Sequence, residues 1–163
     1  MSLEIRPAQP SDHPAAIARI IVPTIRAGET YALDPLLSEA DAVAYWTGAD
    51  RKTFVADRDG AVFGTYYLRA NQAGGGAHVA NCGFMTDADA AGHGIGRAMG
   101  RHALDQARQH GFTAMQFNCV VSTNTRAVKL WQSLGFDVVG RIPGAFRHPR
   151  FGDVDALVMF RAL

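Results

Sequence analysis

Three alternate glycines lie where a strand-like segment gives way to a helix-like one, in the run Gly92-His93-Gly94-Ile95-Gly96-Arg97. Residues 78–86 before it have the composition of a strand, and residues 94–110 after it have the periodicity of a helix. Glycines leave the N–H groups of the first helical turn uncovered, and these groups have no partner within the helix. The helix dipole adds roughly half a positive charge there. The junction therefore predicts a preformed anion site that suits a pyrophosphate.

A second segment has the sequence Asn124-Thr125-Arg126-Ala127-Val128-Lys129-Leu130-Trp131-Gln132-Ser133-Leu134-Gly135-Phe136. Its apolar residues recur at helical spacing, and a glycine ends the pattern. Together the two segments resemble the two signature motifs of the GCN5-related N-acetyltransferases. In that family the first motif, Arg/Gln-x-x-Gly-x-Gly/Ala, binds the acetyl-CoA pyrophosphate, and the second reads Asn-x-x-Ala-x-x-Leu-Tyr-x-x-x-Gly-Phe. The resemblance extends through the flanking strands, over residues 53–160.

The order of the predicted elements agrees with the same family. Asp59-Gly60 between two apolar runs is a strong hairpin signal, and Ser38 has the spacing of a helix cap. Pro14 suits the first turn of an earlier helix. Residues 24–37 and 142–154 are expected to be irregular. The predicted strands are 3–6, 53–57, 61–69, 78–86, 113–120, 136–141 and 155–161, and the predicted helices are 14–23, 39–46, 94–110 and 125–134.

These elements predict one domain over residues 1–163 with a mixed α/β (α+β) fold. The resemblance implies the fold of the family, a central, mostly antiparallel twisted sheet of about seven strands flanked by about four helices. It also implies that strands 78–86 and 113–120 splay apart to admit the cofactor. A chain of this length buries about 70% of its unfolded surface, which is enough for a substantial core.

The resemblance implies acetyl-CoA as the co-substrate and assigns its contacts. Main-chain N–H groups of the glycine-rich loop hold the pyrophosphate, and the end of strand 78–86 pairs with the pantetheine arm as an added strand would. The N–H of either Phe84 or Met85 lies on the thioester oxygen, an oxyanion-hole role. The helix 125–134 either supplies phosphate contacts or presents a solvated face. The predicted cofactor-binding residues are Phe84, Met85, Thr86, Gly92, His93, Gly94, Ile95, Gly96, Arg97, Asn124, Arg126 and Lys129.

Two positions depart from the family motifs. The first motif begins with Ala91 instead of Arg or Gln, which removes one pyrophosphate contact and predicts weaker CoA binding. Trp131 replaces the tyrosine that usually protonates the leaving thiolate, and its indole N–H is not a practical acid. A pantetheine thiol has a pKa near that of cysteine, about 8.5. The thiolate therefore leaves unaided, or takes a proton from Ser122, Tyr66 or Tyr67.

The general base has no carboxylate at the usual family position. Family enzymes often carry a glutamate on the strand before the first motif, but Asn81 occupies the approximate position here and can only orient a water or the substrate. A primary amine with a pKa of about 10.4 is mostly protonated at neutral pH, so a base is useful. Glu29 and His78 are the alternatives. The predicted catalytic residues are Asn81, Glu29 and Ser122.

The acceptor pocket is expected to form from residues 26–33, 61–69 and 144–153. The prediction is an acetyl-CoA-dependent N-acetyltransferase that acetylates the amine of a small molecule or amino-acid-like acceptor by direct attack in a ternary complex. Two alternatives remain open. One is a protein or peptide N-acetyltransferase with an open groove. The other is a catalytically weak acyl-CoA-binding module, which the missing carboxylate and tyrosine favour.

Composition limits the partners. Sixteen basic and fifteen acidic residues give a formal charge of +1 without blocks of like charge, so neither a nucleic-acid nor a membrane partner is predicted. Cys82 and Cys119 lack metal-binding spacing, so they are expected to be buried thiols and no metal is predicted. No secretory signal is recognised near residue 1, which favours a cytoplasmic location. The resemblance allows a homodimer in which the final strands pair.

Overall fold

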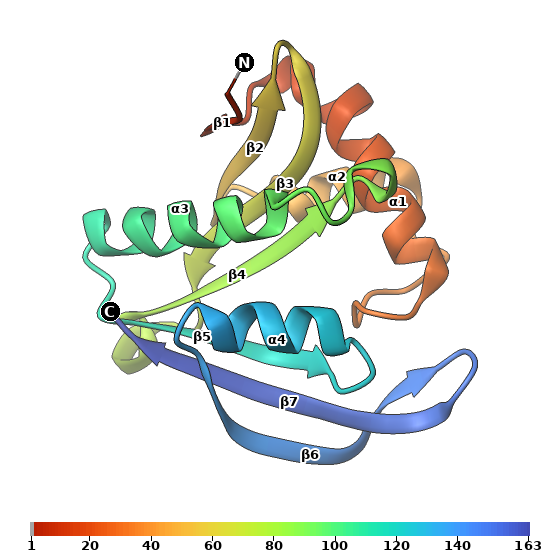
Figure 1. Cartoon of the computed structure of the whole chain (residues 1–163), viewed down its shortest axis with the longest axis vertical. Coiled ribbons are helices and arrows are strands. Elements are labelled where there is room, and N and C mark those ends of the chain that lie inside the picture. The colour runs from red at the N-terminus through yellow and green to blue at the C-terminus, as the bar shows by residue number, and fades with distance from the viewer. Residues whose placement is uncertain (1) are drawn as a thin grey trace.

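A seven-stranded sheet forms the centre of the computed structural model, which describes residues 2–163 (Figure 1). The strand order is β1-β2-β3-β4-β5-β7-β6, and every neighbouring pair is antiparallel except the parallel pair β4–β5. The predicted fold class is confirmed. The strands are β1 Glu4–Pro7, β2 Lys52–Arg58, β3 Ala61–Ala70, β4 Val79–Thr86, β5 Ala114–Val121, β6 Asp137–His148 and β7 Gly152–Ala162, and the α-helices are α1 Ala18–Ala27, α2 Glu39–Trp46, α3 Ile95–Gln109 and α4 Thr125–Ser133.

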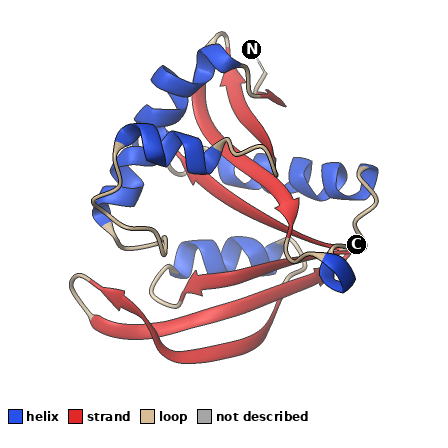
Figure 2. Cartoon of the chain, turned by 180° about the vertical axis from the view of Figure 1, so that it is seen from behind, coloured by secondary structure: helices blue, strands red, loops and turns tan. Residues whose placement is uncertain are grey.

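Helices cover both faces of the sheet and give the chain two apolar cores. Helices α3 and α4 pack on one face, where the core is centred on Met99, Leu104 and Trp131. Helices α1 and α2 pack on the other face, seen from behind in Figure 2, with Ile21 and Trp46 in the second core. The strands alternate between the two cores because successive side chains point to opposite faces.

The parallel pair of strands separates soon after it begins. Within the described chain, β4 and β5 pair at Val79–Ala114 and Ala80–Met115 alone. Figure 1 shows the two strands starting side by side near the end marked C and then diverging. The predicted splay is therefore confirmed, and it leaves main-chain groups of β4 without a strand partner on the side of the gap.

Two predicted boundaries are wrong. Helix α1 continues past Pro23 to Ala27 and ends at Gly28, whose φ is +65°. Proline removes one helical N–H donor, but the buried face of the helix extends to Ile25, so packing maintains the helix. The predicted loop 142–154 is a long hairpin, since β6 reaches His148 and β7 starts at Gly152. Most of β6 is exposed, so its residues lack the apolar alternation of a half-buried strand.

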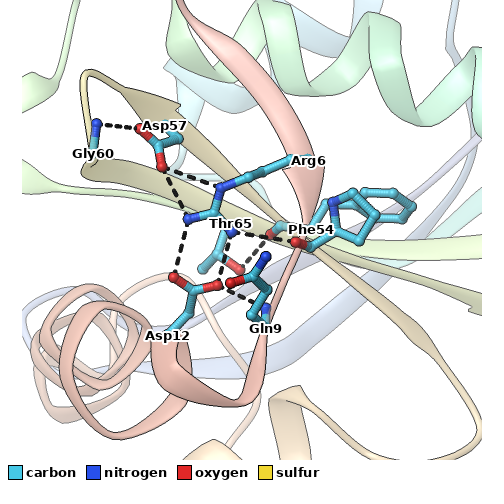
Figure 3. Close-up of polar contacts among 8 residues, drawn as sticks. Arg6, Gln9, Asp12, Phe54, Asp57, Gly60 and Thr65 are labelled. Carbon is cyan, nitrogen blue, oxygen red and sulfur yellow. Dashed lines mark hydrogen bonds and ion pairs between the residues drawn. The ribbon is translucent and has the colours of Figure 1, made fainter.

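One partly buried ion cluster ties the N-terminal strand to the rest of the sheet. Arg6 of β1 donates to both carboxylate oxygens of Asp12, at 2.9 and 3.1 Å, and to Asp57 Oδ2 of β2 at 2.9 Å (Figure 3). The two carboxylates also accept main-chain N–H groups, from Gln9 and Gly60 respectively. Hydrogen bonds to the carboxylates raise the pKa of Arg6 above its ordinary value. The cluster fixes the position of β1 and of the turn that leads to α1.

Candidate active site

A cavity of about 210 Å³ lies where β4 and β5 separate. It is bordered on one side by the segment between α1 and α2, and on the other side by α4. The cavity therefore passes through the sheet between the two helical layers. Its lining residues are Thr30, Tyr31, Ala32, Leu33, Tyr45, Tyr67, Arg69, Asn81, Cys82, Phe84, Phe117, Asn118, Cys119, Val120, Val121, Asn124, Ala127 and Trp131.

The N-terminus of α3 has the geometry of an anion site. Gly94 precedes the helix with φ of +78° and has no side chain to cap it. The N–H of His93 already donates to Ala90 O at 3.3 Å, so the open donors are the N–H groups of Ile95, Gly96 and Arg97. These donors and the helix dipole favour a phosphate group.

Helix α4 brings a guanidinium to the same loop. A Cβ placed on Gly92 would lie 3.5 Å from Arg126 Nη2. Asn124 caps the helix, since its Oδ1 accepts the N–H of Ala127 at 3.3 Å, and its amide NH2 group is directed away from the cap. Lys129 is exposed on the next turn. The structure thus places Arg126 of α4 next to the glycine-rich loop that precedes α3.

Tyr31 occupies the main-chain groups of Phe84 that face the gap. Its hydroxyl accepts the N–H of Phe84 and donates to Phe84 O, both at 2.7 Å. Burial raises the pKa of this hydroxyl well above 10, so it remains a neutral donor. In an antiparallel ladder the pairing groups alternate in direction, so the N–H of Met85 points towards Thr65 of β3. Of these two predicted thioester contacts, Phe84 is the one that faces the gap, and Thr86 follows at the end of β4.

Only one of the three predicted catalytic residues lines the cavity. Asn81 is 6% exposed; its Oδ1 accepts Arg69 Nε at 3.3 Å, and its Nδ2 donates to Gln116 O at 2.9 Å. Glu29 lies outside the lining, and its carboxylate is 3.4 Å from Arg150 Nη2 in the β6–β7 turn. Ser122 also lies outside the lining, with its N–H bonded to Asp155 O.

Trp131 packs in an aromatic cluster beside the gap. Its ring centroid lies 4.7 Å from that of Phe84 and 4.8 Å from that of Phe117. Tyr66, an alternative acid, bonds to His102 Nδ1 at 2.8 Å on α3 and does not line the cavity. Tyr67 does line it, but burial raises the pKa of its hydroxyl. The aromatic residues therefore shape the wall, and none of them is a strong acid.

Both cysteines line the cavity, which the sequence did not indicate. Cys82 is buried and Cys119 is partly buried. Desolvation raises the pKa of both thiols, and Cys82 Sγ lies 3.9 Å from Met115 Sδ. A raised pKa lowers the thiolate fraction, and the thiolate is the nucleophilic form.

Sequence reasoning expected the segment 61–69 at the acceptor pocket without singling out Arg69, and it missed Asn118. Both face the α1–α2 side of the sheet, and Arg69 follows Thr65 and Tyr67 at every second position of β3. Alternation along the predicted strand 61–69 was the available signal for Arg69. Asn118 lies within the register shift of β5 between Phe117 and Val120, and no sequence pattern marks it.

Residues 2–163 contain neither a metal-site arrangement nor a membrane-spanning helix. No cluster of three or more His, Cys, Asp or Glu side chains has the arrangement of a metal site in this part of the chain. None of the helices described there combines the length and apolar character that membrane crossing requires.

Comparison with known proteins identifies the family. The acetyltransferase (GNAT) family model matches residues 21–136. A GCN5-related N-acetyltransferase from Kribbella flavida superposes with a TM-score of 0.92 at 47% identity, covering 99% of this chain and 98% of that one. N-acetyltransferase aca1 of Schizosaccharomyces pombe is 28% identical over 151 residues, which are 82% of this chain and 72% of that protein. The fold of yncA from Salmonella typhimurium, solved with its cofactor acetyl-CoA, gives a TM-score of 0.86 at 23% identity over 100% of this chain and 95% of that one. The chain therefore belongs to the GNAT acetyltransferase family, and it is an acyltransferase enzyme that uses acetyl-CoA.

Proposed function

We propose that this enzyme acetylates the amine of a small-molecule or amino-acid-like acceptor by direct attack in a ternary complex. The main support for this proposal is the cavity that passes through the sheet between β4 and β5. Acetyl-CoA enters from the side of α3 and α4, and the acceptor enters from the side of α1 and α2. The two substrates meet at the gap, which satisfies the positional requirement for a direct transfer.

The cofactor is held mainly by main-chain donors. The N–H groups of Ile95, Gly96 and Arg97 bind the pyrophosphate at the start of α3. Arg126 lies beside Gly92 and supplies the positive charge that Ala91 cannot. Asn124 contacts the pantetheine arm, and Lys129 binds the 3′-phosphate.

The thioester takes the place of the Tyr31 hydroxyl on β4. The N–H of Phe84 then donates to the thioester oxygen. The Tyr31 side chain shifts away from Phe84 so that its hydroxyl donates a hydrogen bond to the thioester sulfur. The neutral amine attacks the carbonyl carbon, the C–S bond breaks, and the CoA thiolate leaves. Asn81 orients the water that accepts the ammonium proton, since none of the residues that line the cavity is a carboxylate.

Replacing Tyr31 by phenylalanine is expected to lower kcat about tenfold without raising KM for acetyl-CoA. The variant loses a hydrogen bond to the developing thiolate, and such charge-assisted bonds contribute about 1.5 kcal/mol or more. Steady-state kinetics measure the effect. The matched control is Tyr66→Phe, which loses only its bond to His102 outside the cavity. Equal kcat values for the two variants would show that the Tyr31 hydroxyl does not assist the departure of the thiolate.

Replacing Cys119 by alanine is expected to change kcat less than threefold. Its pKa is raised by burial, so a covalent acetyl-cysteine intermediate is disfavoured. Cys82→Ala is expected to change kcat as little as Cys119→Ala does. It is also expected to lower the stability of the protein, because Cys82 is buried. Mass spectrometry of the enzyme mixed with acetyl-CoA alone checks the same point. An acetylated cysteine that disappears on addition of acceptor would establish a ping-pong route.

The edge strand β6 supports a homodimer as part of this proposal. It carries exposed apolar side chains at Val138, Val139 and Ile142, and edge strands with apolar residues favour pairing. Light scattering at two protein concentrations tests it, and a monomer at both would reject it.

The test of the function is a thiol-release assay with acetyl-CoA over polyamines, amino acids, other small amines and peptides. Turnover on a small amine supports the proposal. Turnover on peptides alone favours the protein-acetylating alternative. Acetyl-CoA binding by calorimetry without turnover on any amine favours the binding module.

A further inference from the structure

The cavity contains one charged side chain. Of the residues that line it, Arg69 alone carries a formal charge, and none is a carboxylate. The family position that often holds a glutamate is Asn81, which lies directly opposite Arg69 in the β3–β4 ladder. The acceptor side of this site is therefore positive. The inference below rests on the proposed function, because it assigns the acceptor of that reaction.

Arg69 is positioned by its neighbours and keeps donors for a ligand. Its Nε donates to Asn81 Oδ1 at 3.3 Å, and its guanidinium lies 5.4 Å from the ring centroid of Tyr67. Over residues 2–163, no carboxylate forms an ion pair with it. A guanidinium has five N–H donors, so its terminal nitrogens remain for a bidentate anion. The ring of Tyr67 lies against Gly83, the residue before Phe84, which puts Arg69 on the approach to the thioester.

Carboxylates around the cavity are already committed to other arginines. Asp50 pairs with Arg51, whose guanidinium lies 4.8 Å from the ring centroids of Tyr45 and Tyr67 behind the cavity wall. Glu29 pairs with Arg150. The hydrogen bonds from Arg51 lower the pKa of the exposed Asp50 carboxyl, and the charge of Arg69 lowers it further without forming an ion pair. These pairings leave Arg69 as the group that an incoming ligand meets.

Amide side chains extend the polar wall beside Arg69. Asn81 is fixed through Gln116 O, and Gln116 Nε2 donates to Asn118 Oδ1 at 3.0 Å. Asn118 Nδ2 in turn donates to Asn71 Oδ1 at 2.7 Å. Because Arg69 can only donate, it sets the orientation of the Asn81 amide. The wall thus combines one cation with neutral hydrogen-bonding groups.

We propose that Arg69 binds the carboxylate of an amino acid whose α-amine is acetylated. Bidentate guanidinium–carboxylate pairing sets both position and orientation, and it directs the amine along β4 towards Phe84. Pairing with Arg69 also neutralises the carboxylate, whose charge otherwise holds a proton on the neighbouring amine. The site therefore helps to deprotonate the acceptor where a glutamate base is missing. Polyamines and lysine side chains, which bring further positive charge, are disfavoured.

The experiment compares each amino acid of a full panel with its amide and its decarboxylated amine. Thiol release is measured for the wild type, Arg69→Met, Arg69→Lys and the control Arg108→Met, which removes an exposed arginine of α3 paired with Asp105. For the preferred amino acid, Arg69→Met is expected to lower kcat/KM about 50-fold or more, with the amide affected about twofold at most. Arg69→Lys restores part of the loss because lysine binds as a point charge. KM for acetyl-CoA is expected to stay unchanged in both Arg69 variants. The control Arg108→Met is expected to keep the wild-type kcat/KM for the amino acid.

Binding separates this inference from the proposed function. Calorimetry of amino acids against the enzyme–CoA complex is expected to show binding in the wild type that is lost in Arg69→Met, whether or not turnover occurs. Such binding without turnover would contradict the proposed acetylation and leave the carboxylate site supported. A wild type that acetylates amides and decarboxylated amines as well as amino acids would overturn the carboxylate site and leave the acetylation supported. An Arg69→Met variant that still prefers amino acids over their amides would also overturn the carboxylate site.

Discussion

Replacing Gly94 by aspartate is expected to raise KM for acetyl-CoA about 100-fold while the protein stays folded. The new carboxylate lies at the start of α3, next to the donors that bind the pyrophosphate. At an effective dielectric constant of about 20, two unit charges about 6 Å apart repel by roughly 3 kcal/mol, which is about 100-fold in affinity. A Cβ at Gly94 meets no atom within 4 Å, so the new side chain has room and the cost is the backbone strain of the positive φ. Steady-state kinetics and calorimetry with CoA measure the effect.

The matched control for this prediction is Gly94→Asn. Asparagine and aspartate have the same shape, and both tolerate the left-handed conformation that Gly94 adopts at φ of +78°. The asparagine variant carries the backbone strain without the charge, so its KM is expected to rise less than tenfold. Equal KM values for the two variants would place the pyrophosphate elsewhere.

Replacing Arg6 by methionine is expected to lower the free energy of unfolding by about 2 kcal/mol, between the values for exposed and buried ion pairs. The side chain of Arg6 is 24% exposed, and those of Asp12 and Asp57 are 10% and 14% exposed. The substitution leaves the two carboxylates close together without their shared cation. Urea denaturation monitored by circular dichroism measures the change.

Two controls separate charge from packing at this cluster. Arg108→Met removes an exposed pair on α3 and is expected to cost at most about 0.5 kcal/mol. Adding Asp12→Asn and Asp57→Asn to Arg6→Met removes the repulsion between the two carboxylates, and this triple variant is expected to recover part of the loss. A triple variant less stable than Arg6→Met would show that hydrogen bonds of the carboxylates matter more than their charge.

The parts of the fold that local rules determine could be predicted from the sequence. The hairpin at Asp59-Gly60 is one example, since both residues have positive φ, as a tight two-residue turn requires. The gap between β4 and β5 followed from the family resemblance. By contrast, the extent of the β6–β7 hairpin depends on pairing with β5 and on an exposed edge, and neither leaves an apolar pattern.

The acceptor side of the site depends on contacts between residues far apart in sequence. Tyr31 meets Phe84 across 53 positions, and Asn81 meets Gln116 across 35. No local pattern encodes such contacts. The glycine-rich loop is recognisable because its function lies in the backbone of one short segment. The predictions of Glu29 from its segment and of Ser122 from its reach depend on side-chain positions that the sequence does not give, and both residues lie outside the cavity lining.

The most direct test of the central claim is the initial rate of thiol release as both substrates are varied, with the best acceptor of the panel. Direct attack between substrates that meet in the gap predicts intersecting lines in double-reciprocal plots, with no acetyl-enzyme formed from acetyl-CoA alone. Parallel lines with a detectable acetyl-enzyme would contradict the direct transfer.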